Sequence, residues 1–166
     1  STISGTTSCG IRKYEYSRLD DVTIQRVTVA PASGTGIGLY DSTGSSTYQL
    51  TDVVLDDVDV SGGSSGIYLS HSYEGSGGVS ITNCDVCGTT SHGIQVANGR
   101  GVLVVTDNDV SGVTGSSSYG LHLQGADTEP RQALTLANNS IDGCANGLYL
   151  YRFDLVVGRF FEVFDR

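Results

Sequence analysis

The chain has 166 residues, with 23 Gly, 9 Tyr and 4 Phe and with neither Trp nor Met. This length suits a single domain, and no apolar run approaches the ~20 residues that a membrane-spanning helix needs. The formal net charge of −9, from 18 acidic and 9 basic residues, makes nucleic acid a poor partner, because a phosphate backbone needs a cationic surface. Gly, Ser, Thr and Val dominate in place of the usual helix formers, so the composition favours strands.

The pattern Gly, apolar, any residue, apolar recurs along the chain. An imperfect copy at 10–13 is followed by copies at 36–39, 66–69, 93–96, 120–123 and 147–150. Successive glycines are therefore 26, 30, 27, 27 and 27 residues apart. A string in which apolar residues alternate, break phase once at a polar residue and alternate again precedes each full copy; the strings are 22–29, 53–60, 79–86, 103–110 and 134–141.

This unit predicts a strand, a tight bend, a second strand, a loop and a third strand. Its repetition without a helical segment predicts an all-β fold, a parallel β-solenoid of about five full rungs of three short strands plus partial end rungs. A β-sandwich or β-propeller is the alternative, but propeller blades are longer, at ~40 residues. We expect a single domain over 1–166, with a partial first rung at 1–18, regular rungs at 19–151 and a Phe-rich cap or stacking surface at 152–166.

Rungs that stack about 4.8 Å apart align like positions in columns, which we call files. Four inward files are aliphatic, and one of them runs through Leu39, Leu69, Val96, Leu123 and Leu150. A fifth turns polar in its last two rungs and consists of Val27, Val58, Cys84, Asn108 and Asn139. We expect the two buried amides to bond each other and the backbone. We also expect free cysteines, since only Cys84 and Cys87 lie near one another in this arrangement.

The outward positions of the third strand carry aromatic rings, amides and a histidine. The candidates for carbohydrate binding are Tyr40, Tyr68, Gln95, His122, Gln124, Tyr149 and Tyr151. Ring faces pack on the apolar C–H patches of sugars, while amides and imidazole bond hydroxyls. The alternative is that the tyrosines serve cross-strand packing alone, since Tyr is common on solvent-facing strands.

An outward file on the second strand is acidic. Asp59, Asp85 and Asp109 lie one rung apart there, and three carboxylates about 4.8 Å apart repel one another unless a proton or a cation intervenes. They are candidate Ca²⁺ ligands, because Ca²⁺ prefers carboxylate oxygens. The alternative is a solubilising acidic edge that blocks lateral strand addition. No other cofactor is indicated.

The two ends of the predicted solenoid are candidates for self-association. The residues concerned are Ile3 at the start and Phe160, Phe161 and Phe164 at the end. A solenoid end exposes unpaired backbone groups and a cross-section of the core. Head-to-tail contacts between copies would extend into a filament, whereas a compact cap would close the core.

Two strings carry a family resemblance. They are Asp21-Val22-Thr23-Ile24-Gln25-Arg26-Val27 and Ser33-Gly34-Thr35-Gly36-Ile37-Gly38-Leu39, and the later rungs repeat them. Over roughly residues 19–151 the chain resembles the right-handed parallel β-helix (pectin-lyase-like) family, which includes mannuronan epimerases and copper-deposition periplasmic proteins. The resemblance implies a right-handed parallel β-helix (β-solenoid).

The epimerases in that family carry Gly-Tyr-Gly-Phe-Asp-Pro-His-Glu on the third strand, where the Tyr, the His and the acids move the sugar proton. The matching stretch here is Gly36-Ile37-Gly38-Leu39-Tyr40-Asp41-Ser42-Thr43. Ile37 and Ser42 stand in place of the Tyr and the His, so the epimerase catalytic motif is not matched. A lyase or epimerase would need another general base near a polarising group, and the candidates are His122, Tyr68, Tyr149 and Arg152.

Together these patterns predict an extracellular or cell-surface β-helix module that presents a Tyr/His/Gln-lined strand face to polysaccharide. We expect it to bind rather than to catalyse, as a piece of a carbohydrate-active protein. The first alternative is a structural protein whose open ends stack head to tail into a homo-oligomeric filament. The second alternative is a polysaccharide lyase or epimerase.

Overall fold

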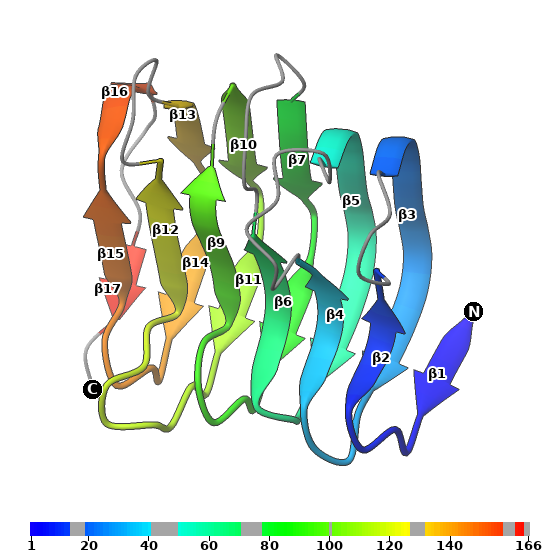
Figure 1. The fold of residues 1–166 in the computed structure, drawn as a ribbon. Helices are drawn as coiled ribbons and strands as arrows, with labels where there is room; N and C mark the ends of the chain where they lie inside the picture. The colour runs from blue at the N-terminus through cyan, green and yellow to red at the C-terminus, as the bar shows by residue number, and fades with distance from the viewer. Residues whose placement is uncertain are drawn as a thin grey trace.

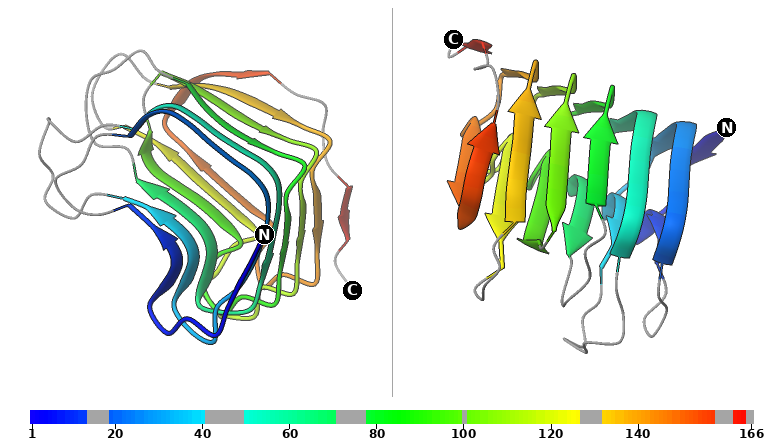
Figure 2. Two further views of the ribbon diagram at one scale, coloured as in Figure 1. Left: turned by 90° about the vertical axis from the view of Figure 1, so that its right-hand side faces the viewer. Right: turned by 90° about the horizontal axis from the view of Figure 1, so that it is seen from above.

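The computed structural model of the chain describes residues 1–13, 19–40, 50–70, 78–99, 101–126, 132–157 and 162–164. These residues form strands and no helix, and the strands lie in two sheets, which we call A and B (Figure 1). All the strand pairings among them are parallel. Viewed from its N-terminal end, the chain winds clockwise as it recedes, so the coil is right-handed (Figure 2). The predicted fold, a right-handed parallel β-helix of about five full turns, is confirmed.

Sheet B contains the third strand of each rung. Its six strands are β2 (Cys9–Arg12), β4 (Thr35–Leu39), β6 (Ser65–Ser70), β9 (Ile94–Gly99), β12 (Leu121–Gly125) and β15 (Leu148–Tyr151). They stack in chain order, from β2 at one edge to β15 at the other. These strands coincide with the Gly-apolar-x-apolar copies, so the repeated pattern marks one sheet of the coil.

Sheet A contains the first and second strands of the rungs. Its members are β1 (Thr2–Ser4), β3 (Leu19–Ala30), β5 (Leu50–Ser61), β7 (Gly78–Thr82), β8 (Asp85–Cys87), β10 (Val102–Thr106), β11 (Asp109–Ser111), β13 (Gln132–Ala137), β14 (Ser140–Asp142), β16 (Phe153–Val157) and β17 (Glu162–Phe164). In β3 and β5 the two segments form one bent strand of 12 residues. In the following rungs they are separate strands.

A residue in the left-handed backbone region makes each bend. Arg26 (φ 54°) and Asp57 (φ 54°) lie within β3 and β5, while Asn83 (φ 53°), Asp107 (φ 59°) and Asn138 (φ 55°) separate the shorter strands. Asn and Asp adopt this conformation more readily than other residues with a side chain, because their short polar groups can bond the local backbone. The polar phase break in the sequence therefore marks the corner of the coil.

The glycine at the start of each third strand is required by close packing. An added Cβ on Gly66 would lie 2.6 Å from the carbonyl oxygen of Gly93 and would overlap the Val86 side chain. At Gly36 and Gly93 the carbonyl oxygen of the next such glycine would be 2.7 Å away. No residue with a side chain fits so close to a neighbouring backbone, which explains why the pattern begins with glycine.

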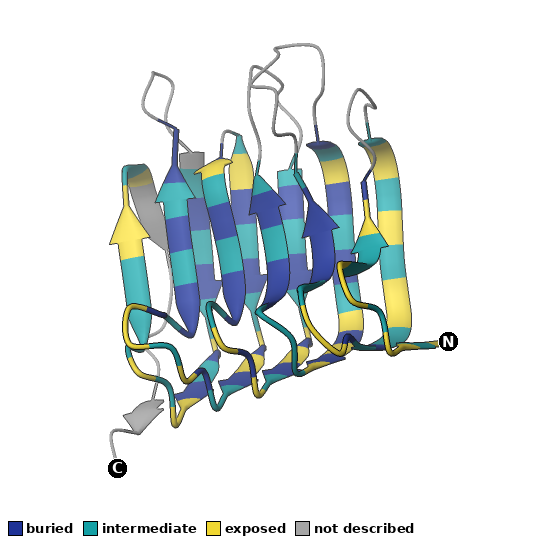
Figure 3. Cartoon of the chain, turned by 60° about the horizontal axis from the view of Figure 1, so that its bottom comes forward, coloured by how far each residue is buried: buried dark blue, intermediate teal, exposed yellow. Residues whose placement is uncertain are grey.

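The predicted inward files form the core. Leu69 pairs with Val96 and Val96 pairs with Leu123, and each of these side chains is at most 1% exposed. Burial is less complete at the two ends of the coil, where Ile11 is half-buried and Leu150 is 37% exposed. Figure 3 shows the same trend, with exposed residues frequent along β3 and buried ones frequent along β5.

The polar end of the fifth inward file is a hydrogen-bonded ladder. Asn108 Nδ2 donates to Asn139 Oδ1 at 2.8 Å and to the Ile81 carbonyl oxygen at 3.0 Å. Asn139 Nδ2 donates to the Val105 carbonyl oxygen at 2.9 Å, and Asn108 Oδ1 accepts from the Cys84 backbone N–H at 3.0 Å. Both asparagines are at most 3% exposed. The predicted pairing of buried amides is confirmed, and it satisfies polar groups that would otherwise be costly inside the core.

Replacing the last amide of this ladder should destabilise the fold. In Asn139→Ala, the Asn108 amide and the Val105 carbonyl lose a buried partner, so we expect the free energy of unfolding to fall by about 2 kcal/mol. Urea denaturation followed by circular dichroism measures this change. The control is Ser140→Ala at the adjacent outward position, which we expect to stay within about 0.5 kcal/mol of the parent. Equal losses in the two variants would contradict the role of the ladder.

Candidate functional site

The outward file of sheet B has the predicted register. Its aligned members are Arg12, Gly38, Tyr68, Gln95, His122 and Tyr149. Tyr68, Gln95, His122 and Tyr149 are all half-buried, so each is held by its neighbours while part of it stays accessible. Three of the four candidate catalytic residues, Tyr68, His122 and Tyr149, therefore share one file.

Two further aromatic residues join this file, and the repeat pattern in the sequence did not indicate them. His92 and Tyr119 each precede the glycine that opens a third strand, a position assigned to the loop. The His92 and His122 ring centroids lie 4.7 Å apart with planes 10° apart, and Tyr119 lies 5.5 Å from His122 at 29°. Tyr149 covers the other side of His122 at 4.7 Å and 24°. We call His92, Tyr119, His122 and Tyr149 the ring cluster.

Backbone geometry holds the ring cluster in place. The Tyr119 backbone N–H donates to His92 Nδ1 at 3.1 Å, so His92 Nδ1 carries no proton in this arrangement. The adjoining loop residues continue the ladder, with Gly93 N–H donating to the Tyr119 carbonyl at 3.1 Å and Gly120 N–H to the Asn146 carbonyl at 2.9 Å. The loops before β9 and β12 are thus stacked in register like the strands, and their rings stack as a consequence.

Burial favours the neutral form of the two imidazoles in the cluster. Burial lowers the pKa of His122 below its ordinary value of 6.5. Burial also lowers the pKa of His92, and repulsion from His122 in its protonated form adds to this effect. The Nδ1 atom of His122 is buried and has no hydrogen-bond partner among the described residues, so no hydrogen bond at this atom fixes the ring, which is stacked between its neighbours. Because His92 and Tyr149 cover its two faces, a ligand would meet the edge of the His122 ring.

Aromatic and cationic pairs lie at both ends of the file. Tyr40 and Tyr68 have ring centroids 5.1 Å apart, and the Arg12 guanidinium lies 5.4 Å from the Tyr40 ring. At the other end the Arg152 guanidinium lies 4.7 Å from the ring of Tyr151, which is 41% exposed. Both distances are within the range of cation–π attraction. Arg152, the fourth candidate catalytic residue, is therefore placed beside Tyr151.

The second outward file of sheet B is interrupted. Gln124 pairs with Tyr151 as predicted, but the pairing between β9 and β12 shifts after Leu123, where Gly125 pairs with Gly99. Asn98, at φ 54°, is the extra residue on the β9 side. Such a bulge turns the local strand and offsets the side chains that follow. The first outward file is therefore the continuous one.

Charge is divided between the sheets. The strands of sheet B contain no Asp or Glu, whereas Asp59, Asp85 and Asp109 lie in register in sheet A. Burial raises the pKa of Asp85, and the Asp109 and Asp59 charges on either side raise it further. No group of three His, Cys, Asp or Glu side chains is arranged to hold a metal ion within the described residues. The Ca²⁺ site at these aspartates stays a prediction.

The residues predicted for self-association are only partly described. Ile3 lies in β1, pairs with Val29 and packs partly buried against the core. Phe160 and Phe161 lie outside the described residues, and Phe164 is described only as the backbone partner of Asp142 between β17 and β14. End-to-end stacking therefore stays a prediction.

The fold and this file define a parallel β-helix protein with one ring-lined sheet whose strands bear no carboxylate and one acidic sheet. The chain belongs to the family described as periplasmic copper-binding protein (NosD), whose family model matches residues 1–156. No curated protein and no solved structure matches the chain significantly. The periplasm lies outside the cytoplasm, so the family description is compatible with the predicted location. Within the described part of the chain, no helix is long and apolar enough to cross a membrane.

The described residues do not fit a copper site. Copper is bound by imidazole, thiolate and thioether groups, and the chain contains no Met. The four cysteines are free as predicted, but no three His, Cys, Asp or Glu side chains in the described part of the chain are grouped so that they could hold a metal ion. The imidazoles of His92 and His122 lie face to face, so their nitrogens do not converge. These groups supply no copper ligand set.

Acidification should destabilise this protein through the two histidines. Their folded pKa values lie below 6.5, so the unfolded chain binds more protons near that pH, and the free energy of unfolding falls as the pH falls through this window. Thermal unfolding at about pH 7.5 and about pH 5 should show a larger drop for the parent than for a His92→Gln, His122→Gln variant. Equal drops in the two proteins would count against neutral imidazoles in the folded state.

Removing the central charge of the acidic file should stabilise the protein. We expect Asp85→Asn to raise the free energy of unfolding at neutral pH by about 0.5 kcal/mol, because like charges on adjacent strands repel. The matched control is Asp142→Asn, which removes an exposed charge two residues further along β14 than the position of this file at Ser140. Urea denaturation should be repeated with Ca²⁺. Ca²⁺ bound at the file would stabilise the parent but not Asp85→Asn, and a destabilised Asp85→Asn without Ca²⁺ would contradict the repulsion.

Proposed function

We propose that this protein is a β-helix module, working outside the cytoplasm, whose sheet B binds a polysaccharide chain laid across the rungs. The observation that carries the proposal is the ring cluster in its file. Stacked rings at one-rung spacing place polar edges, imidazole nitrogens and phenol hydroxyls, in a row on a surface whose strands bear no carboxylate. A polymer of sugars repeats its hydroxyl groups along a line, which such a row matches.

The stacking changes how a sugar would be held. The faces of His122 are covered by His92 and Tyr149, so the contact of ring faces with sugar C–H patches that the sequence suggested does not apply to this ring. Hydrogen bonds from ring edges and from the Gln95 amide take its place. Exposed ring surface remains at Tyr151, which is 41% exposed. Neutral imidazoles also cost less to desolvate against a ligand than charged ones.

Binding rather than catalysis is the better-supported role. A lyase or epimerase needs a general base beside a group that stabilises the developing charge. His122 is neutral and could accept a proton, but its ring is stacked on both sides. The described strands of sheet B offer no carboxylate to assist it. A lyase or epimerase activity of His122, Tyr68, Tyr149 and Arg152 is therefore the weaker proposal.

Removing the polar edges without removing the rings tests this function. In a His122→Phe, Tyr149→Phe variant the stack is retained, but a nitrogen edge and a hydroxyl are lost, so we expect affinity to fall about tenfold, near the value of one to two hydrogen bonds. Affinity electrophoresis in gels containing neutral or acidic polysaccharides measures the change. The control is Thr135→Ala on the outer face of sheet A, which should bind like the parent. If no gel of a broad panel retards the parent, the proposal is wrong.

A further inference from the structure

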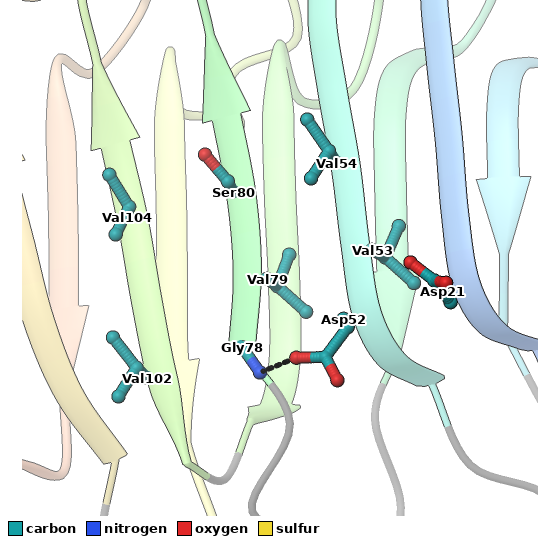
Figure 4. A pocket seen from close by; sticks show the side chains of 9 residues that line it. All are labelled: Asp21, Asp52, Val53, Val54, Gly78, Val79, Ser80, Val102 and Val104. Carbon is teal, nitrogen blue, oxygen red and sulfur yellow. Dashed lines mark hydrogen bonds between the residues drawn. The ribbon is translucent and has the colours of Figure 1, made fainter.

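We propose a second site, a docking surface on the outer face of sheet A that receives a Lys or Arg side chain of a basic partner protein. The outer face there holds a hollow of about 240 Å³. Figure 4 shows its surroundings, with Asp21 and the β5 residues Asp52 and Val54 on one side, Gly78 and Ser80 of β7 in the middle, and Val102 and Val104 of β10 on the other side. It lies on sheet A, so the proposal does not depend on polysaccharide binding by sheet B.

The hollow exists because one outward position has no side chain. Gly78 begins β7 and pairs with Val102 of β10, and its backbone N–H donates to Asp52 Oδ1 of β5 at 3.2 Å. Asp52 and Val102 therefore stand on either side of Gly78, roughly 10 Å apart across two rungs. One row further along the strands, Val54 and Val104 are aligned with Ser80 between them. The result is a short trough with an acidic end and an apolar end.

The chemistry of this trough suits a long basic side chain. The aliphatic stem of Lys or Arg packs on apolar surface while its charged head reaches a polar group, and here the head would meet the carboxylate of Asp52 or Asp21. No Lys or Arg is among the described residues that line the hollow. Val102 is 47% exposed, an unusual state for a large apolar side chain within the described core-forming strands. A partner stem covering it would remove this surface from water.

Charge complementarity identifies the partner as basic. The chain has a formal charge of −9, and the described aspartates lie on the strands and bends of sheet A rather than on the strands of sheet B. Long-range attraction would bring a cationic protein surface to this face. The hollow would then hold one Lys or Arg side chain of that partner surface in a defined position. Electrostatic attraction alone would not depend on the valine-lined hollow. A variant that fills the hollow and keeps every charge therefore tests the site.

A short oligolysine peptide is the probe, and isothermal titration calorimetry at moderate salt is the measurement. The decisive variant is Gly78→Val, which fills the hollow and leaves every charge in place. An added Cβ at this position would meet only the Val102 carbonyl oxygen, at 3.7 Å, so the fold should be retained, and a circular dichroism melt verifies this. We expect Gly78→Val to weaken binding about tenfold. Unchanged binding in the folded variant, or no binding by the parent, overturns the proposal.

Two charge variants separate the site from general attraction. Asp52→Asn keeps an acceptor for the Gly78 N–H and tolerates the backbone at φ 51°, since Asn adopts this region readily. Asp59→Asn removes the same charge at an exposed position in the acidic file. We expect Asp52→Asn to weaken oligolysine binding several-fold more than Asp59→Asn does. Equal losses in both would show diffuse electrostatic attraction and overturn the site.

Discussion

The parallel hydrogen-bond ladder between successive rungs is the interaction on which the rest of this molecule depends. It places each rung about 4.8 Å above the last, so a residue type that recurs at the repeat length becomes a continuous file. Aliphatic residues in such a file make a core, as Leu69, Val96 and Leu123 do. Carboxylates in such a file repel one another, and aromatic rings in such a file stack. The chemistry of each surface follows from what the files contain.

The two sheets carry opposite chemistry on this one framework. Sheet B places uncharged rings and amides side by side, and the stacked loops before β9 and β12 add His92 and Tyr119 to them. Sheet A carries the carboxylates, and a missing side chain at Gly78 opens a trough beside them. A ligand rich in hydroxyls suits the first surface and a cationic side chain suits the second. Both sites extend across several rungs, because each is built from residues of neighbouring strands.

Much of this arrangement could be read from the sequence because the repeat is strict. The period located the strands, and the alternation within each unit separated inward from outward residues, which the Tyr68, Gln95 and His122 pairings confirm. The sequence predicted only part of the ring cluster. His92 and Tyr119 lie in the loops before β9 and β12, and apolar alternation identifies strands but does not indicate that such loops are stacked in register. The bulge at Asn98 depends on a single backbone angle. The hollow depends on the first residue of β7, a strand boundary that the pattern locates least well.

The asparagine pair has a consequence for how the coil assembles. Asn108 and Asn139 occupy the last positions of a file that is Val27, Val58 and Cys84 in the earlier rungs. If the chain slipped by one whole repeat during folding, one amide would face an apolar neighbour and lose its buried partner, at a cost of a few kcal/mol. Aliphatic side chains alone would accept such a slip, since the repeats are nearly interchangeable. The paired amides therefore disfavour stacking in the wrong register between rungs that are otherwise similar in sequence.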